Sequence, residues 1–187
     1  MELSVRSAYD REGKRKYLSR TEGQKFLEQT VHLPRLDALF CLTLYYTGCR
    51  ISEALNLRGC DLDSELNTVL IRSLKKRRRK EIRRIPLPEF LAHELMAASD
   101  PNSEQRIWTF SRPTGWRMIK RVMKGAAISG VRTTTKGLRH GFGVRGALVQ
   151  IPRSLIQHRM GHADATTTAI YLAVQDEEER ALIQKTW

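Results

Sequence analysis

Long hydrophobic runs are absent from this 187-residue sequence. No apolar stretch approaches the roughly 20 residues that a bilayer-spanning helix needs, and the N-terminus, MELSVRSAYDREGKRK, has no apolar core of a secretory signal. We therefore expect a soluble protein of the cytoplasm that has no membrane partner.

Cysteine is also scarce. Cys41, Cys49 and Cys60 form no CxxC pair, and an odd number of cysteines does not suit a disulfide framework or a zinc knuckle. His158 and His162 have i,i+4 spacing, but no HExxH-like glutamate lies between them and no third ligand is near in sequence. We predict no metal and no cofactor.

Acidic residues are too few to balance the basic ones. The chain has 33 Lys and Arg against 20 Asp and Glu, a net charge of +13. Such a surplus predicts a polyanionic partner, most often nucleic acid and less often an acidic membrane surface. The 41% of hydrophobic residues is enough for a core, and the length suits one domain.

The positive charge is concentrated in residues 72–84, RSLKKRRRKEIRR, which contain nine Lys or Arg and one Glu. The flanking segments 68–74 and 82–88 are β-rich, with apolar positions at Val69, Ile71, Ile82 and Ile85. This pattern predicts two strands joined by a very basic turn. The alternative is a solvated charge run, of the kind found in nuclear-localisation signals.

The remaining pattern is mostly helical. Ser19 and Glu22 form a capping box for a helix to about Val31. Pro34 opens a second helix, which Gly48 ends, and its apolar face is Leu36, Leu39, Phe40, Thr43 and Leu44. Further expected elements are helices over 51–57, 89–98 and 114–127, a buried strand over 106–110, and three or four short helices from residue 136 onward, the last one acidic. The predicted fold class is α+β, mainly α: one helical domain with a small β-hairpin.

Three stretches have residues suited to phosphate chemistry. In TGCRISEALNL, Arg50 follows a Gly turn at a helix start, where a guanidinium and free N–H groups can converge on a phosphate. In KGLRHGFG, Lys136 and Arg139 lie one helical turn apart. In MGHADATTTAIYL, His162 follows a glycine and precedes Tyr171 by nine residues. Taken singly, each has an ordinary structural reading: a salt bridge, a cap, or core packing.

Together and in this order, these segments resemble the tyrosine recombinase (phage integrase) family. The resemblance lies in TGCRISEALNLRGCDLD, the hairpin end RRIPL, LRHGFG and RMGHADATTTAIYL, and it covers about residues 17–175. It implies a site-specific recombinase, of integrase or invertase type, that cuts and rejoins double-stranded DNA through a 3′-phosphotyrosyl intermediate. It also implies a monomer when free, a homotetramer on DNA, and association with the nucleoid.

The resemblance implies a catalytic role for residues that match the family motifs. Arg50 and Arg139 match the two catalytic arginines, His162 the position held by His or Trp, and Tyr171 the nucleophile. The hairpin lysine of the family is Lys75 or Lys76, and we favour Lys76 as the catalytic one.

The chain departs from the family pattern at Lys136, where HxxR is more usual. A lysine there can donate to a phosphate oxygen and belongs in the predicted catalytic set, but near pH 7 it cannot act as a neutral imidazole base. We interpret Glu53 as holding Arg50 or a neighbouring cation, and His140 as structural. The predicted DNA-binding residues are the remaining cations of the hairpin: Arg72, Lys75, Arg77, Arg78, Arg79 and Lys80.

The expected domains are a basic arm over 1–16 and a catalytic domain over 17–187. Most family members carry an N-terminal helical domain that completes a clamp on DNA, so the chain is either a fragment or similar to short members such as the fimbrial invertases. The acidic segment 176–187 either docks on a neighbouring protomer or packs on its own domain.

Two other functions stay open. Lys136 and the missing half of the clamp motivate a recombinase-like DNA-binding protein without turnover. A type IB topoisomerase, which uses a similar residue set without sequence choice, ranks third.

Overall fold

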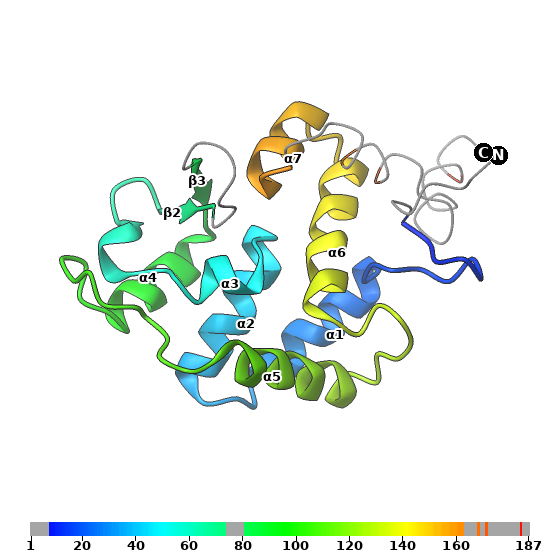
Figure 1. The fold of residues 1–187 in the computed structure, drawn as a ribbon, viewed down its shortest axis with the longest axis horizontal. Helices are drawn as coiled ribbons and strands as arrows, with labels where there is room; N and C mark the ends of the chain where they lie inside the picture. The colour runs from blue at the N-terminus through cyan, green and yellow to red at the C-terminus, as the bar shows by residue number, and fades with distance from the viewer. Residues whose placement is uncertain (1–7, 74–80, 163–167, 169–170, 172–183, 185–187) are drawn as a thin grey trace.

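The structure is a computed structural model that describes residues 8–73, 81–162, 168, 171 and 184. In this part of the chain, a small antiparallel sheet lies at one side of a group of helices (Figure 1). The helices are α1 (Arg20–Thr30), α2 (Arg35–Thr47), α3 (Ile51–Ala54), α4 (Glu89–Ala97), α5 (Arg112–Gly125), α6 (Thr135–Leu148) and α7 (Arg153–Met160), with a 3-10 helix, η1 (Gly59–Asp61). The predicted fold class, mainly helical α+β, is confirmed.

The sheet consists of β1 (Leu62–Asp63), β2 (Thr68–Arg72) and β3 (Ile82–Pro86), in the order β1-β2-β3. The predicted hairpin is present as β2 and β3, with Leu70 opposite Arg84, whereas β1 was not predicted. Val69, Ile71 and Ile85 are buried as expected, but Ile82 is 52% exposed because it lies on the outer face of β3. The turn residues 74–80 lie outside the described part of the chain.

The predicted signals at α1 and α2 are confirmed. The Ser19 hydroxyl accepts from the Glu22 N–H at 3.2 Å, and the Ser19 N–H donates to the Glu22 carboxylate at 3.0 Å. Gly48 ends α2 in the left-handed conformation, with φ of 61°. Leu36, expected on the apolar face, is instead 45% exposed, because it lies in the first turn of α2 at the edge of the core.

Three expected elements differ in the structure. Residues 106–110 are not a strand: an isolated bridge joins Arg106 to Arg58, and no described strand pairs with the segment, although Trp108 is buried. The helix expected over 51–57 ends at Ala54, and η1 follows it. Between residue 136 and Gly161 there are two helices, α6 and α7, and the predicted acidic helix lies outside the described residues.

One buried core joins α1 to α6 and the sheet. Phe26, Phe40, Leu44, Trp108 and Met123 are among its fully buried side chains. A smaller cluster lies where the N-terminal segment meets α6 and α7, and it contains Ala8, Tyr17, Val144, Ile156, Met160 and Tyr171. Among the described residues, no helix is long and apolar enough to cross a bilayer.

Candidate active site

The C-terminal end of α7 brings three arginines together. The last carbonyl groups of a helix have no partner within the helix and carry partial negative charge, so they attract cations. Here three consecutive carbonyls accept from guanidinium groups of three other elements: Arg159 from Arg83 at 2.9 Å, Met160 from Arg139, and Gly161 from Arg50 at 3.2 Å. This helix end therefore sets the positions of the arginines.

The carboxylate of Glu53 links two of these three arginines. Its carboxylate pairs with Arg50 at 2.8 Å and with Arg83 at 2.8 Å, and it accepts the Arg50 backbone N–H at 2.9 Å. Burial alone would raise the pKa of Glu53, but Arg83 and Arg50 outweigh it and hold the pKa below its ordinary value. The prediction that Glu53 holds Arg50 is confirmed.

Arg139 lies on α6 with 9% of its surface exposed. It donates to the carbonyls of Gly48, at 2.7 Å, and of Met160, so it ties the end of α2 to the end of α7. Burial, together with the charge of Arg50, lowers the pKa of Arg139 to about 10, and it stays protonated at neutral pH. A guanidinium has more N–H donors than two carbonyls use, so Arg139 can still donate to a ligand.

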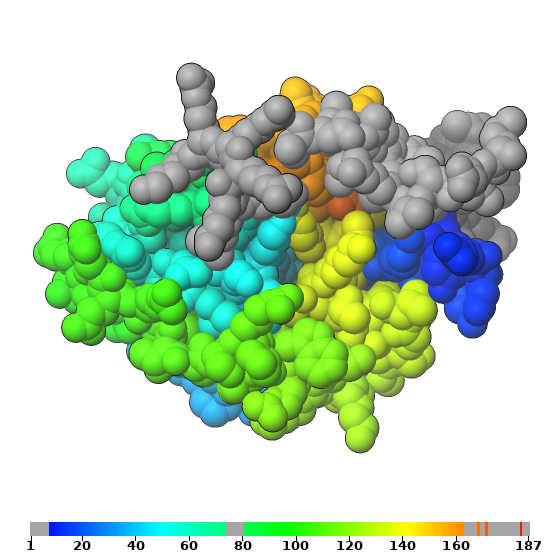
Figure 2. All heavy atoms as spheres, viewed as in Figure 1, coloured from blue at the N-terminus to red at the C-terminus, as the bar shows by residue number. Residues whose placement is uncertain are grey.

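A cavity of about 370 Å³ opens beside these groups. Its lining comes from α3, the start of α5, α6 and the residues after α7: Arg50, Ile51, Ser52, Arg112, Thr135, Lys136, Arg139, His140, His162 and Tyr171. Figure 2 shows the α3 region (cyan) beside α6 (yellow), with α5 (green) below them. Among the described residues that line it, four are Lys or Arg and none is a carboxylate, so the charge of the cavity suits an anion; we refer to it as the anion cavity.

Tyr171 faces this cavity from a buried position, with 2% of its surface exposed. Its hydroxyl lies 2.9 Å from Nδ1 of His140, and a Cβ at Gly143 would lie 2.4 Å from its ring, so the glycine makes room for the tyrosine. Burial raises the pKa of Tyr171 to about 12, and Arg139 and Arg50 oppose that rise without cancelling it. The charges of the two arginines favour the phenolate, but burial has the larger effect on the pKa.

His162 is neutral in this site. Its Nδ1 lies 3.0 Å from the Thr168 hydroxyl, and its ring stacks on Tyr171 with 6.1 Å between centroids. Burial, followed by the charges of Arg139 and Arg50, lowers its pKa to about 3. His162 therefore offers a hydrogen bond near pH 7 and adds no charge to the site.

Five of the six residues that we predicted as catalytic line this cavity: Arg50, Lys136, Arg139, His162 and Tyr171. The sixth, Lys76, lies outside the described residues, as do the predicted DNA-binding residues Lys75, Arg77, Arg78, Arg79 and Lys80. Arg72 is described, and it pairs with the buried Asp61 at the end of β2 while 43% of its side chain stays exposed.

Arg83 was not among the predicted site residues, and His140 was predicted to be structural only. Arg83 is fully buried under the site, and the alternation of buried and exposed residues along IRRIP would have placed it inward with Ile85. His140 touches Tyr171 although 31 residues separate them, and no local pattern encodes that contact.

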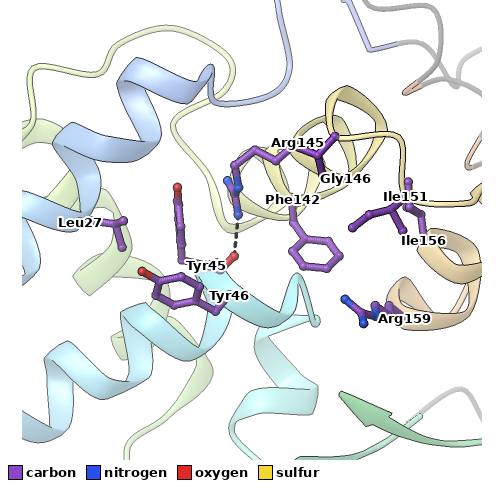
Figure 3. Close-up of a pocket in the computed structure, with 10 residues that line it drawn as sticks. Leu27, Tyr45, Tyr46, Phe142, Arg145, Gly146, Ile151, Ile156 and Arg159 are labelled. Atoms are coloured by element: carbon purple, nitrogen blue, oxygen red, sulfur yellow. Dashed lines mark hydrogen bonds between the residues drawn. The ribbon is translucent and has the colours of Figure 1, made fainter. Parts of the chain in front are cut away.

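A second cavity, of about 310 Å³, lies on a different side of α6. Figure 3 shows Tyr45, Tyr46, Phe142, Ile151 and Ile156 around it. The guanidinium of Arg145 lies 3.9 Å from the Tyr45 ring centroid and donates to the Tyr45 carbonyl at 2.8 Å. This cavity shares no lining residue with the anion cavity.

The fold is that of a recombinase catalytic domain. The crystal structure of XerA recombinase is 25% identical, with a TM-score of 0.76, over 91% of this chain and 64% of that one. The catalytic domain of bacteriophage HP1 integrase shares the fold, with a TM-score of 0.66 at 17% identity, over 90% of this chain and 93% of that one.

The phage integrase family model matches residues 16–178, so this chain belongs to the phage integrase family. A similar curated protein is tyrosine recombinase XerA of Thermococcus onnurineus (strain NA1), 31% identical over 181 residues, which cover 91% of this chain and 62% of the relative. XerA of Thermococcus kodakarensis is 29% identical over the same shares. The chain thus spans just under two thirds of the length of these relatives.

Proposed function

We propose that this protein is a site-specific DNA recombinase that cleaves and rejoins double-stranded DNA through a covalent 3′-phosphotyrosyl link at Tyr171. The observation that supports it most is the placement of the Tyr171 hydroxyl in a cavity whose described lining has three guanidinium groups, one lysine and no carboxylate. Strand exchange needs a nucleophile beside a phosphodiester and cations around the oxygens that gain charge in the transition state. Family membership agrees with this assignment.

The residues take the following roles in the proposed reaction. Arg50 and Arg139 bind the two non-bridging oxygens, because planar guanidinium groups match that geometry better than ammonium groups do. Lys136 adds positive charge at the mouth of the cavity, and neutral His162 donates a hydrogen bond. The Tyr171 oxygen attacks phosphorus, and the bond to the 5′-oxygen breaks.

Lys76 is the proposed acid that protonates the departing 5′-oxygen. The remaining hairpin cations, Lys75, Arg77, Arg78, Arg79 and Lys80, with Arg72, would hold the DNA backbone on either side. The link to tyrosine conserves the phosphoester bond, so rejoining needs no nucleotide cofactor.

DNA is the proposed partner, and the cytoplasm, with the nucleoid, is the proposed location. The Tn1549 transposon integrase, whose fold this chain shares at 20% identity and a TM-score of 0.65, is in complex with transposon right end DNA. The charge of +13 on this chain suits the same kind of ligand.

Tyr171→Phe is expected to abolish covalent attachment to DNA while leaving DNA binding unchanged, because only the attacking oxygen is removed. The substrate is a duplex isolated from a randomised library by binding to the variant, then nicked next to the scissile phosphate so that the cut is trapped. Denaturing electrophoresis measures the covalent complex. A wild-type protein that binds this duplex and forms no complex would instead indicate a DNA-binding protein without turnover.

We also propose that the free protein is a monomer of 21.5 kDa and that four copies assemble on two DNA duplexes. Light scattering after size exclusion is expected to give one chain without DNA and four chains with the selected duplex and the Tyr171→Phe variant. A stable mass of one protein per duplex at all concentrations would contradict the tetramer.

A further inference from the structure

The histidine that follows Arg139 has an unassigned place in the site. Nδ1 of His140 lies 2.9 Å from the hydroxyl of Tyr171, and the two rings meet edge to face with 5.6 Å between centroids. His140 also lines the anion cavity. Within the described part of the chain, His140 is thus the side chain that hydrogen-bonds to the oxygen proposed as the nucleophile.

Lys136 carries an amine rather than an imidazole, and as an ammonium group it donates hydrogen bonds and accepts none. His162, the other imidazole of the cavity, is bonded through its Nδ1 to the Thr168 hydroxyl and stacks on the Tyr171 ring rather than facing its oxygen. The geometry leaves His140 as the acceptor in contact with the Tyr171 proton.

Resting on the recombinase function proposed above, we propose that His140 is a catalytic residue that receives the Tyr171 proton as the phenolic oxygen attacks phosphorus. In this step the O–H bond of Tyr171 breaks and an N–H bond forms at Nδ1, the Tyr171 oxygen bonds to phosphorus, and the 5′-oxygen leaves with a proton from Lys76. On rejoining, the 5′-hydroxyl attacks phosphorus, Lys76 recovers its proton, and His140 returns the other to the departing phenolic oxygen.

The protonation state of His140 agrees with this role. Burial, then the charges of Lys136, Arg139 and Lys16, lower its pKa to about 3, and His162 and Tyr171 are the other titratable groups that face it. The ring is therefore neutral at pH 7, and with its proton on Nε2 it accepts the hydrogen bond from Tyr171.

Binding of DNA improves His140 as a base. A phosphodiester anion in the cavity offsets part of the field of Lys136 and Arg139, which raises the pKa of His140 toward neutrality. The phenolic oxygen also loses basicity as its bond to phosphorus forms, so the transfer becomes favourable as the reaction proceeds.

The test compares His140→Ala with His140→Asn. An asparagine places an amide oxygen close to the position of Nδ1, so it can accept the hydrogen bond but cannot take the proton. We expect both variants to bind the selected duplex normally and to cleave it about 10²–10⁴ times more slowly than wild type in a single turnover. Cleavage by His140→Asn within about threefold of the wild-type rate would show that the acceptor only orients the phenol and would overturn the proposal.

A duplex with sulfur in place of the scissile 5′-oxygen distinguishes deprotonation of Tyr171 from protonation of the leaving group. A thiolate leaves without a proton, so this substrate bypasses the acid step but still needs the Tyr171 proton to be removed. We expect the His140→Asn defect to persist on this duplex. Restoration to the wild-type rate would place His140 on the leaving-group side and overturn the proposal.

A measurement without DNA keeps this inference distinct from the proposed function. With ¹³C at Cζ of tyrosine, the Tyr171 resonance is assigned by its loss in Tyr171→Phe. It is expected to move in His140→Ala and to stay near its wild-type position in His140→Asn. An unmoved resonance in His140→Ala would show that His140 does not contact Tyr171 and would overturn the proposal, whether or not the protein cleaves DNA.

The opposite combination is a resonance that moves as expected in a protein that forms no covalent complex. That result would overturn the recombinase function and the catalytic role of His140, although the contact itself would be confirmed.

Discussion

Replacing Glu53 by alanine is expected to lower the free energy of unfolding by about 3–5 kcal/mol. Its carboxylate is 1% exposed and is the anion between two arginines, of which Arg83 is fully buried. Among the described residues, removing it leaves the buried Arg83 charge with a hydrogen bond to the Arg159 carbonyl and no counter-ion. A buried charge without a counter-ion is among the costliest defects in a protein core. Urea denaturation at pH 7 measures the change.

Glu104→Ala is the matched control. Glu104 also pairs with an arginine, Arg58, at 3.4 Å, but 85% of its side chain is exposed. Removal of an exposed pair changes stability by about 0–1 kcal/mol. Equal effects of the two substitutions would contradict the structural role assigned to Glu53.

The pH dependence of stability has a defined sign for Glu53. Its pKa in the folded protein lies below its ordinary value of 4.5. The stabilisation that comes from its ionised form is therefore complete above that value and is lost as the pH falls through the lower, folded-state pKa. The Glu53→Ala defect is expected to shrink in acid over that range.

Arg139→Lys is expected to slow DNA cleavage by about 10²–10³-fold while leaving affinity for the selected duplex within a few-fold of wild type. Lysine keeps the charge that attracts DNA but cannot bond to two carbonyls and still present a planar pair of donors to a phosphate. Single-turnover cleavage rates and gel-shift titrations measure the two quantities separately.

Arg145→Lys controls for the loss of an arginine from the same helix. Arg145 stacks on Tyr45 and donates to its carbonyl in the second cavity (Figure 3), which shares no lining residue with the anion cavity. We expect this variant to lose stability and to cleave DNA at a rate close to that of wild type. If Arg145→Lys cleaves DNA as slowly as Arg139→Lys does, the effect at Arg139 reflects helix packing rather than phosphate binding.

Local signals in the sequence predicted much of the fold. Ser19 and Glu22 cap α1 through contacts three residues apart, and Gly48 ends α2 by a left-handed turn, so both features depend on neighbouring residues. Residues 106–110 had a strand-like composition, but a strand also needs a partner, and only Arg106 has a bridge to another segment in the described structure. Pairing is a tertiary property that composition does not carry.

The candidate site was predictable to a similar degree. The resemblance to the recombinase motifs selected Arg50, Lys136, Arg139, His162 and Tyr171, and all five line one cavity in the structure. The contact of His140 with Tyr171 depends on the close approach of the tyrosine ring to Gly143. The positions of the site arginines depend on their hydrogen bonds to the carbonyls at the end of α7. Both arise from packing between distant segments.

Peptide mapping of the trapped DNA complex is the most direct test of the proposed chemistry. The wild-type protein is incubated with the nicked duplex, digested with trypsin and nuclease, and sequenced by mass spectrometry. We predict a 3′-linked nucleotide on the oxygen of Tyr171 and on no other residue. A nucleotide attached to a different side chain, or a cut duplex with no attached peptide, would contradict the central claim.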